Sequence, residues 1–297
     1  MACSIALIIL IWAANFVAAK VGVRYLPALT LASFRVTLAA ALMLPIYLFL
    51  ARRLRFQEAA APGISWRDAW VFLYLGFFGV VVNQVGFTVG LRYTSVSHAA
   101  VIVGMGPIYT LTLAVLFGLE RADRSKVFGM VIAFAGVAIL ASDSLRSGNA
   151  SLLGDAITFS GSLGFAMYVV LAKRVATRYD SLTMTAFNHF AGALVILPIA
   201  VHKARLLYLS AGWRAVPWQG WAAVAYMAVF ASALAYLVYF WLLRYLSPSE
   251  LSAFTYALPI VATLIGIVWL GERASWTQAA GGALALVGLY TVEAGRR

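Results

Sequence analysis

Amides stand inside several otherwise apolar stretches of this sequence. Asn83 and Gln84 lie next to each other in one such stretch, and Asn15 lies in another. A side-chain amide that is removed from water must find protein partners or a ligand, because leaving its polar atoms unpaired is costly. We therefore predict that these three amides contribute to a binding site.

Arg35 and His189 are the ionisable residues that lie furthest inside apolar stretches. A charge buried away from water is costly and tends to be kept for a function. Arg35 could equally be a structural clamp on backbone carbonyls or loop carboxylates, so both interpretations stay open. We expect His189 to satisfy a local hydrogen bond rather than to relay protons.

Acidic residues are absent from the interior of the apolar stretches. All ten fall in the links between stretches or at their ends. Carriers that couple to protons or sodium usually place a carboxylate or a broken backbone deep among their helices. We therefore predict a facilitator or exchanger that is driven by the gradient of its substrate.

Aromatic residues make up 14% of the chain, and several of them lie towards the interior of apolar stretches. Together with the amides they could line a cavity that suits a neutral or zwitterionic molecule with an apolar side, such as an aromatic amino acid. Packing or contact with lipid explains any single one of them equally well. The predicted substrate-binding residues are Asn15, Asn83, Gln84, Met105, Phe165, Tyr168, Tyr236, Tyr239, Phe254 and Tyr256.

The backbone is predicted to be interrupted at two corresponding points. One is the Gly-Met-Gly-Pro sequence at 104–107, and the other is Tyr-Ala-Leu-Pro at 256–259. Proline removes a helical hydrogen bond and can free carbonyls to face a cavity, although it can also kink a helix for packing alone. The predicted interruption or gating residues are Gly104, Gly106, Pro107 and Pro259.

The composition places these residues in a membrane protein. Hydrophobic residues make up 64% of the 297 residues and charged residues 11%, whereas a soluble domain has about 25% charged residues. The net charge of +12 sits mainly in short links, which is a signal of membrane topology rather than of nucleic-acid binding. We expect lipid, and no nucleic acid, around the chain.

The apolar stretches define ten predicted transmembrane helices, since a bilayer core takes roughly 20 apolar residues per helix. The predicted fold class is thus all-α and integral to the membrane. The ten spans are residues 2–22, 28–50, 69–91, 96–118, 126–142, 151–172, 181–202, 218–243, 249–270 and 275–293.

The sequence repeats itself. The motif LRYxSxS at 91–97 recurs at 243–249, an offset of 152 residues (243 − 91), and 13 of the 50 positions from 91 to 140 are identical at this offset. Glu120 matches Glu272 in the same register, which chance similarity between apolar helices does not produce. We predict two repeats, residues 1–148 and 149–297, that together form one membrane domain.

Five helices per repeat is an odd number, so the second repeat must enter the membrane from the opposite side. Such inverted repeats are common in secondary transporters. Lys and Arg number 13 in one set of alternate links and 8 in the other, and the richer set is expected to be cytoplasmic. We predict a multi-pass protein of the bacterial inner membrane with both termini in the cytoplasm.

Enzymatic motifs are missing from the sequence. The three histidines are scattered, no H-E-x-x-H or Walker A sequence occurs, and the single cysteine is Cys3. Metal-assisted hydrolysis and self-contained ATP-driven pumping need such motifs. We expect no catalytic residues, no metal and no cofactor.

Several motifs together resemble the EamA-type branch of the drug/metabolite transporter superfamily. The resemblance covers nearly the whole chain and rests on Trp12-x-x-Asn15-x-x-x-x-Lys20, Arg35, Pro107 and Pro259, and the Glu-Arg pairs at 120–121 and 272–273. It implies a ten-helix inverted-repeat fold that usually exports small metabolites, amino acids among them. Phe165 and Tyr168 stand where Trp12 and Asn15 would repeat, and Asn188 stands where Arg35 would repeat.

The predicted function is alternating-access export of small neutral or amphipathic metabolites around a central cavity, with amino acids, including aromatic ones, favoured. The alternatives are a transporter of sugars, nucleotide sugars or drugs, and a non-transporting membrane assembly protein. The expected partners are the small-molecule substrate and the lipid bilayer. The sequence does not specify an oligomeric state, and a monomer is compatible with it.

Overall fold

The structure is a computed structural model that describes residues 1–54, 66, 68–94, 96–145, 151–210, 212–258, 260–261, 264 and 276–294. Helices dominate these ranges, and no strand occurs in them. The helical segments are α1 (Ala2–Tyr25), α2 (Ala28–Leu54), α3 (Asp68–Gly76), η1 (Phe77–Val85), α4 (Gly86–Tyr93), α5 (Val96–Gly104), α6 (Gly106–Leu116), α7 (Arg124–Leu145), α8 (Leu152–Val175), α9 (Ser181–Ser210), η2 (Trp213–Ala215), α10 (Trp218–Tyr226), η3 (Met227–Leu234), α11 (Ala235–Leu243), α12 (Pro248–Ala253), η4 (Phe254–Tyr256) and α14 (Trp276–Ala294).

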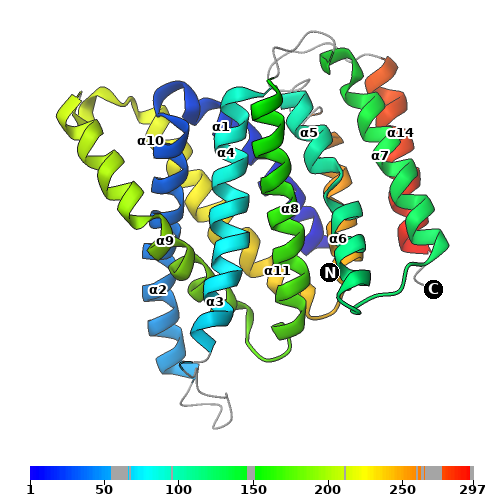
Figure 1. The fold of residues 1–297 in the computed structure, drawn as a ribbon, viewed down its shortest axis with the longest axis horizontal. Helices are drawn as coiled ribbons and strands as arrows, with labels where there is room; N and C mark the ends of the chain where they lie inside the picture. Colours follow the sequence, from blue (N-terminus) through cyan, green and yellow to red (C-terminus); the bar gives the residue numbers. More distant parts are fainter. Residues whose placement is uncertain are drawn as a thin grey trace.

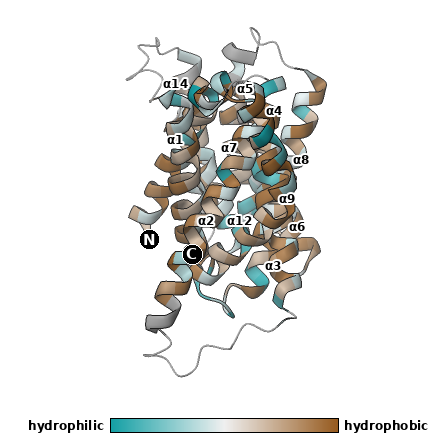
Figure 2. Cartoon of the chain, turned by 90° about the vertical axis from the view of Figure 1, so that its left-hand side faces the viewer, coloured by the Kyte–Doolittle hydropathy of each residue, from teal (hydrophilic) through white to brown (hydrophobic). Residues whose placement is uncertain are grey.

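Six helices among the described residues are long and apolar enough to cross a membrane. Shorter apolar helices at 101–116 and 279–292 lie beside them. Large apolar side chains are exposed along these helices, as Figure 2 shows by the brown that covers much of their length. An apolar outer surface of this extent needs lipid around it, so the fold is that of an all-helical, multi-pass membrane protein. The six spans are 2–25, 28–50, 68–93, 152–175, 181–210 and 218–243.

Two helices that contain a proline continue beyond the ends of the predicted spans. Helix α2 continues past Pro45 to Leu54, and α9 continues past Pro198 to Ser210. A proline inside a helix removes one backbone hydrogen bond and bends the helix, and neighbouring helices can compensate for that loss. The predicted membrane span 28–50 is confirmed although its helix continues beyond it, whereas the span predicted to end at 202 extends to 210.

The helices stand side by side in Figure 1, and they pack in pairs that join distant parts of the chain. The pairs are α7 with α14, α2 with α9, and α1 with α10. Helix α8 packs on α4, α6 and η1. Segments from the first and second halves of the sequence thus pack directly against each other.

Glycines bring α7 and α14 into close contact. A Cβ atom on Gly136 would lie 2.3 Å from the backbone nitrogen of Ala285, and one on Gly288 would lie 2.2 Å from the backbone nitrogen of Ala133. Small residues let membrane helices approach closely where no hydrophobic effect drives them together. The backbones of α7 and α14 therefore touch at these positions.

Two long spans change to π-helix in their middle. The span from 68 to 93 consists of α3, η1 and α4, and the span from 218 to 243 consists of α10, η3 and α11. A π-helical stretch widens the backbone turn and commonly marks a functional site. The sequence analysis did not predict either stretch.

The predicted interruption at 104–107 coincides with a break in the helix. Met105 separates α5 from α6, and Pro107 lies in the first turn of α6, where its missing N–H costs little. The 3₁₀ segment η4 follows α12 in the corresponding region of the second half. Pro259 lies outside the described residues.

Candidate functional site

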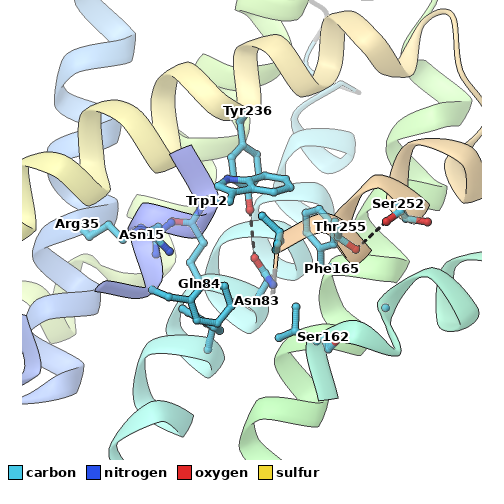
Figure 3. Close-up of a pocket in the computed structure, with 15 residues that line it drawn as sticks. Trp12, Asn15, Arg35, Asn83, Gln84, Ser162, Phe165, Tyr236, Ser252 and Thr255 are labelled. Atoms are coloured by element: carbon cyan, nitrogen blue, oxygen red, sulfur yellow. Dashed lines mark hydrogen bonds between the residues drawn. The ribbon is translucent and has the colours of Figure 1, made fainter. Parts of the chain in front are cut away.

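A cavity of about 100 Å³ lies between helices of both halves of the chain. This volume holds several water molecules. Figure 3 shows its polar and aromatic side chains pointing towards one another from α1, α2, η1, α8 and the α12–η4 segment. The lining residues are Trp12, Asn15, Phe16, Arg35, Asn83, Gln84, Phe87, Val103, Gly106, Ser162, Phe165, Tyr236, Ser252, Thr255 and Leu258.

The π-helix η1 carries both amides that line the cavity. The Asn83 Nδ2 atom donates to the carbonyl of Gly161 at 3.1 Å, and the Asn83 Oδ1 atom accepts from the hydroxyl of Tyr236 at 3.1 Å. The same hydroxyl lies 3.2 Å from the carbonyl of Gly79. Asn83 is thereby held between α8 and α11 (Figure 3).

Gln84 belongs to a buried chain of hydrogen bonds. The Arg35 Nε atom donates to the Ser232 hydroxyl at 2.8 Å, and that hydroxyl donates to Gln84 Oε1 at 3.0 Å. Gln84 Nε2 lies 3.3 Å from His189 Nε2, and His189 Nδ1 lies 2.9 Å from the carbonyl of Thr185. A carbonyl can only accept, so His189 carries its hydrogen on Nδ1 and accepts from Gln84 on Nε2.

This chain of hydrogen bonds fixes four elements against one another. Arg35 comes from α2, Ser232 from η3, Gln84 from η1 and His189 from α9. Each link in the series joins one donor to one acceptor, and hydrogen bonds that are connected in this way make a buried region rigid. His189 forms a local hydrogen bond, as the sequence suggested.

The two π-helices each present a carbonyl to a side chain. The carbonyl of Gly79 in η1 shares the one hydrogen of the Tyr236 hydroxyl with Asn83 Oδ1, and the carbonyl of Ala231 in η3 accepts from the Trp12 indole at 3.2 Å. These two carbonyls are 152 positions apart in the sequence (231 − 79), which is the offset of the internal repeat. Backbone groups that the π-helices leave available thus anchor two aromatic walls of the cavity.

Aromatic rings form one side of the cavity. The Trp12 ring meets Phe165 edge-on at 5.7 Å and Tyr236 at 6.1 Å between centroids. Such edge-to-face pairs are favourable arrangements of aromatic rings. Figure 3 places Trp12 and Tyr236 over the amides, so polar and aromatic surfaces face each other across the cavity.

Seven residues predicted to act in binding, gating or charge interactions line the cavity. They are Asn15, Arg35, Asn83, Gln84, Gly106, Phe165 and Tyr236.

The remaining predicted residues that the structure describes lie away from the cavity lining. Tyr168 and Tyr239 are buried behind Phe165 and Trp12, and Phe254 lines a narrow apolar pocket next to α1. Tyr256 donates to the carbonyl of Met130.

Three predicted residues near the break after α5 also lie away from the cavity. Met105 accepts from the Tyr109 hydroxyl, Gly104 faces Val137, and Pro107 is buried.

Several of the lining residues are not predicted from the sequence. Trp12 enters only as part of a motif, and Ser162, Ser252 and Thr255 are not among the predicted residues. A small hydroxyl residue in an apolar span is a weak signal, because it can bond to its own helix, as Ser252 and Thr255 do.

Polar contacts also join the two halves at the end of the bundle where α6 ends and α12 begins. Glu120 accepts from the backbone N–H of Ser249 at 2.9 Å and from the Ser249 hydroxyl, and it pairs with Lys126 at 3.2 Å. Lys173 donates to the carbonyls of Leu243 and Leu246 at 2.7 and 2.8 Å. The contacts of Glu120 with Ser249 thus tie the link after α6 to the start of α12.

The fold is that of a multi-pass membrane protein with a cavity between its helices. The sequence profile of the EamA-like transporter family matches residues 1–142 and again residues 152–293. The chain belongs to the EamA-like transporter family. It is therefore a member of a transporter family and not an enzyme.

Relatives and a solved structure agree with this assignment. An "Uncharacterized transporter" of Archaeoglobus fulgidus is 28% identical over 97% of this chain and 96% of its own length. A "Probable terminal-alkyne amino-acid exporter" of Streptantibioticus cattleyicolor is 25% identical over 97% and 92%, and the "Uncharacterized inner membrane transporter YedA" of Escherichia coli K12 is 27% identical over 90% and 81%. A chain in a crystal structure matches with a TM-score of 0.74 at 18% identity, over 100% of this chain and 98% of the other, which supports the fold alone.

Proposed function

We propose that this protein exports small neutral or amphipathic metabolites, and amino acids, including aromatic ones, in particular. The observation that carries the proposal is the cavity itself. The rings of Trp12, Phe165 and Tyr236 and the amides of Asn15 and Asn83 line the same cavity. A zwitterion with an apolar side chain needs both kinds of surface, and ligand sites usually combine apolar walls with a few placed polar groups.

The transport mechanism that we propose is alternating access between two inverted five-helix repeats, residues 1–148 and 149–297, in a ten-helix domain. Two observations support it: one family profile matches each half separately, and equivalent helices pair across the halves, as α7 does with α14 and α2 with α9. The π-helices η1 and η3 lie in the third long span of each half, as a repeat would require. Exchange of conformation between the repeats would open the cavity to each side in turn.

The energy source that we propose is the gradient of the substrate, so that the protein works as a facilitator or exchanger. No Asp or Glu is among the described residues that line the cavity. Coupling to protons usually relies on a carboxylate or another titrating group at the transport site. The buried His189 is already engaged on both ring nitrogens.

We propose the bacterial inner membrane as the location, with both termini in the cytoplasm. The excess of Lys and Arg in alternate links supports this orientation. The word "inner membrane" in the name of one relative supports the location.

Efflux from proteoliposomes tests the proposal. Vesicles that contain the purified protein are loaded with radiolabelled phenylalanine, leucine, glucose or a quaternary ammonium drug, and release is followed with and without an imposed proton gradient. The proposal predicts saturable release of the amino acids without any ion gradient. Release of the sugar or the drug alone would assign a different substrate class, and no release of any solute would favour an assembly role.

A further inference from the structure

Arg35 has binding capacity that the protein does not use. It is only 4% exposed and lines the cavity. Its one hydrogen bond to the described residues runs from Nε to Ser232. The two terminal nitrogens of the guanidinium therefore keep their hydrogens available at the cavity.

Nothing in the described cavity lining neutralises this charge. The lining contains aromatic, amide and hydroxyl residues but no carboxylate. The acidic side chains with described contacts are engaged elsewhere: Asp68 pairs with Arg178, Asp155 accepts from Thr94, and Glu120 accepts from Ser249. A charge held in the membrane without a partner is expensive, so an anionic group of a ligand would relieve a large cost.

The hydrogen-bond chain presents the guanidinium in a fixed orientation. Ser232 holds the Nε edge, and Gln84 and His189 hold Ser232 in turn. The planar guanidinium matches a carboxylate with two parallel N–H···O bonds. Because the side of the group that bears Nε is already fixed, the site is organised before the ligand arrives, which lowers the entropy cost of binding.

A second buried polar group in the lining lacks a partner. Asn15 is 6% exposed, and its Oδ1 atom has no hydrogen-bond partner in the described part of the chain. Figure 3 shows Asn15 and Arg35 on the same side of the pocket. An unpaired buried acceptor beside an unpaired buried cation suits a ligand that offers an anion and a donor next to each other, as the carboxylate and ammonium of an amino acid do.

We propose that Arg35 binds the carboxylate of the transported solute and that Asn15 accepts a hydrogen bond from the neighbouring ammonium. This inference rests on the proposed function, because it assigns the head-group contacts of the same cavity. Pairing of Arg35 with a carboxylate would favour carboxylates over amides, alcohols and amines that have the same apolar side. The aromatic walls provided by Trp12, Phe165 and Tyr236 favour an apolar carboxylate over inorganic phosphate.

Thermal unfolding of the purified protein in detergent tests this inference without transport. The probes are 3-phenylpropionate, its carboxamide, phenylalanine and inorganic phosphate. We expect phenylalanine and 3-phenylpropionate to raise the melting temperature in a saturable manner, with an apparent affinity at least tenfold higher than that of the carboxamide. Phosphate is expected to have no saturable effect.

Variants separate binding from a structural role of Arg35. Arg35→Gln keeps a donor for Ser232 but removes the charge, and it should abolish the preference for the carboxylate over the carboxamide. Arg35→Lys should restore part of that preference. Asn15→Ala should lower the apparent affinity for phenylalanine more than that for 3-phenylpropionate, because 3-phenylpropionate has no ammonium group.

Equal stabilisation of the wild-type protein by the carboxylate and the carboxamide would overturn the inference, and so would the absence of any effect of the carboxylates. The wild-type comparison decides the matter even if a variant does not fold. Failure of the proposed function would appear separately, as absence of amino-acid flux in proteoliposomes despite carboxylate binding in detergent.

Discussion

Two tyrosines in neighbouring turns of α11 have different roles at the level of single atoms. The Tyr236 hydroxyl lies within hydrogen-bond distance of Asn83 Oδ1 and the carbonyl of Gly79, whereas the Tyr239 hydroxyl is buried and has no partner in the described part of the structure. Both rings pack near Trp12. The hydroxyl of Tyr236 therefore positions the site, and that of Tyr239 does not.

This difference gives a matched pair of variants. Tyr236→Phe should lower the free energy of unfolding by about 1 kcal/mol, the net contribution of one buried hydrogen bond. It should also reduce amino-acid efflux several-fold, because Asn83 keeps only one of its two hydrogen bonds, the one to Gly161. Tyr239→Phe removes an unpaired hydroxyl and should leave both quantities nearly unchanged. Thermal unfolding in detergent measures the change in stability, and efflux from proteoliposomes measures the change in transport. Equal effects of the two variants would contradict the assigned roles.

At the residue scale the sequence predicts polar positions better than aromatic ones. Asn15, Asn83 and Gln84 line the cavity, since a buried amide has few alternatives to a polar environment. Tyr168 and Tyr239 pack behind the lining. A buried ring is equally stable in a cavity wall and in the packing behind it, and the rotation of an all-apolar helix is set by its neighbours, so sequence spacing cannot separate the two environments.

At the scale of elements, close contact between α7 and α14 depends on glycine. A Cβ atom at Gly136 would overlap the backbone of Ala285. Gly136→Leu should force the helices apart and destabilise the protein by about 1–3 kcal/mol or more, the range for overpacked interiors. Gly106→Ala is the control, because its Cβ would meet only Ser162 Oγ at an ordinary 3.6 Å. Melting temperatures of both variants in detergent compare them, and a Gly136→Leu variant as stable as Gly106→Ala would refute the contact.

Glu120 connects two links that belong to different halves of the chain. Because it holds both the backbone and the hydroxyl of Ser249, Glu120→Ala should loosen this end of the bundle. In a Cys3→Ser background, a cysteine at Thr255 in the cavity lining should then react faster with a maleimide that reaches it from this end. Asp123→Ala, which alters an exposed carboxylate in the same link, is the control. An unchanged labelling rate in Glu120→Ala would show that this contact does not close the cavity.

Elements with a strong local signal could be predicted, and those that depend on packing could not. The break at Met105 follows from Gly and Pro in adjacent positions. The π-helices η1 and η3 contain neither proline nor an unusual charge. Their geometry is stabilised by contacts from other helices, including the Trp12 and Tyr236 hydrogen bonds to their carbonyls, and those contacts are not visible in the sequence of either segment.

At the scale of the whole molecule, the proposed inverted repeat fixes the sides on which the links emerge. Green fluorescent protein fused after Arg297 should fluoresce, and alkaline phosphatase inserted after Gly212 should be active in the periplasm of a bacterial host. The charge distribution over the links supports this orientation. If alkaline phosphatase were active both after Gly212 and when fused after Arg297, the link and the C-terminus would lie on the same side, which would exclude the proposed topology.

In the proposed mechanism the solute occupies the cavity during exchange. Counterflow tests this claim most directly: proteoliposomes loaded with unlabelled phenylalanine are diluted into labelled phenylalanine without an ion gradient, and uptake of label is followed. The wild-type protein should accumulate label transiently.

Two adjacent positions on α8 make the test specific. Ser162 lines the cavity, and Leu163 is 38% exposed on the outer surface. Ser162→Trp should fill the cavity and abolish counterflow, whereas Leu163→Trp should leave it intact. Counterflow that persists in a folded Ser162→Trp variant, or that is absent from the wild-type protein, would contradict transport through this cavity.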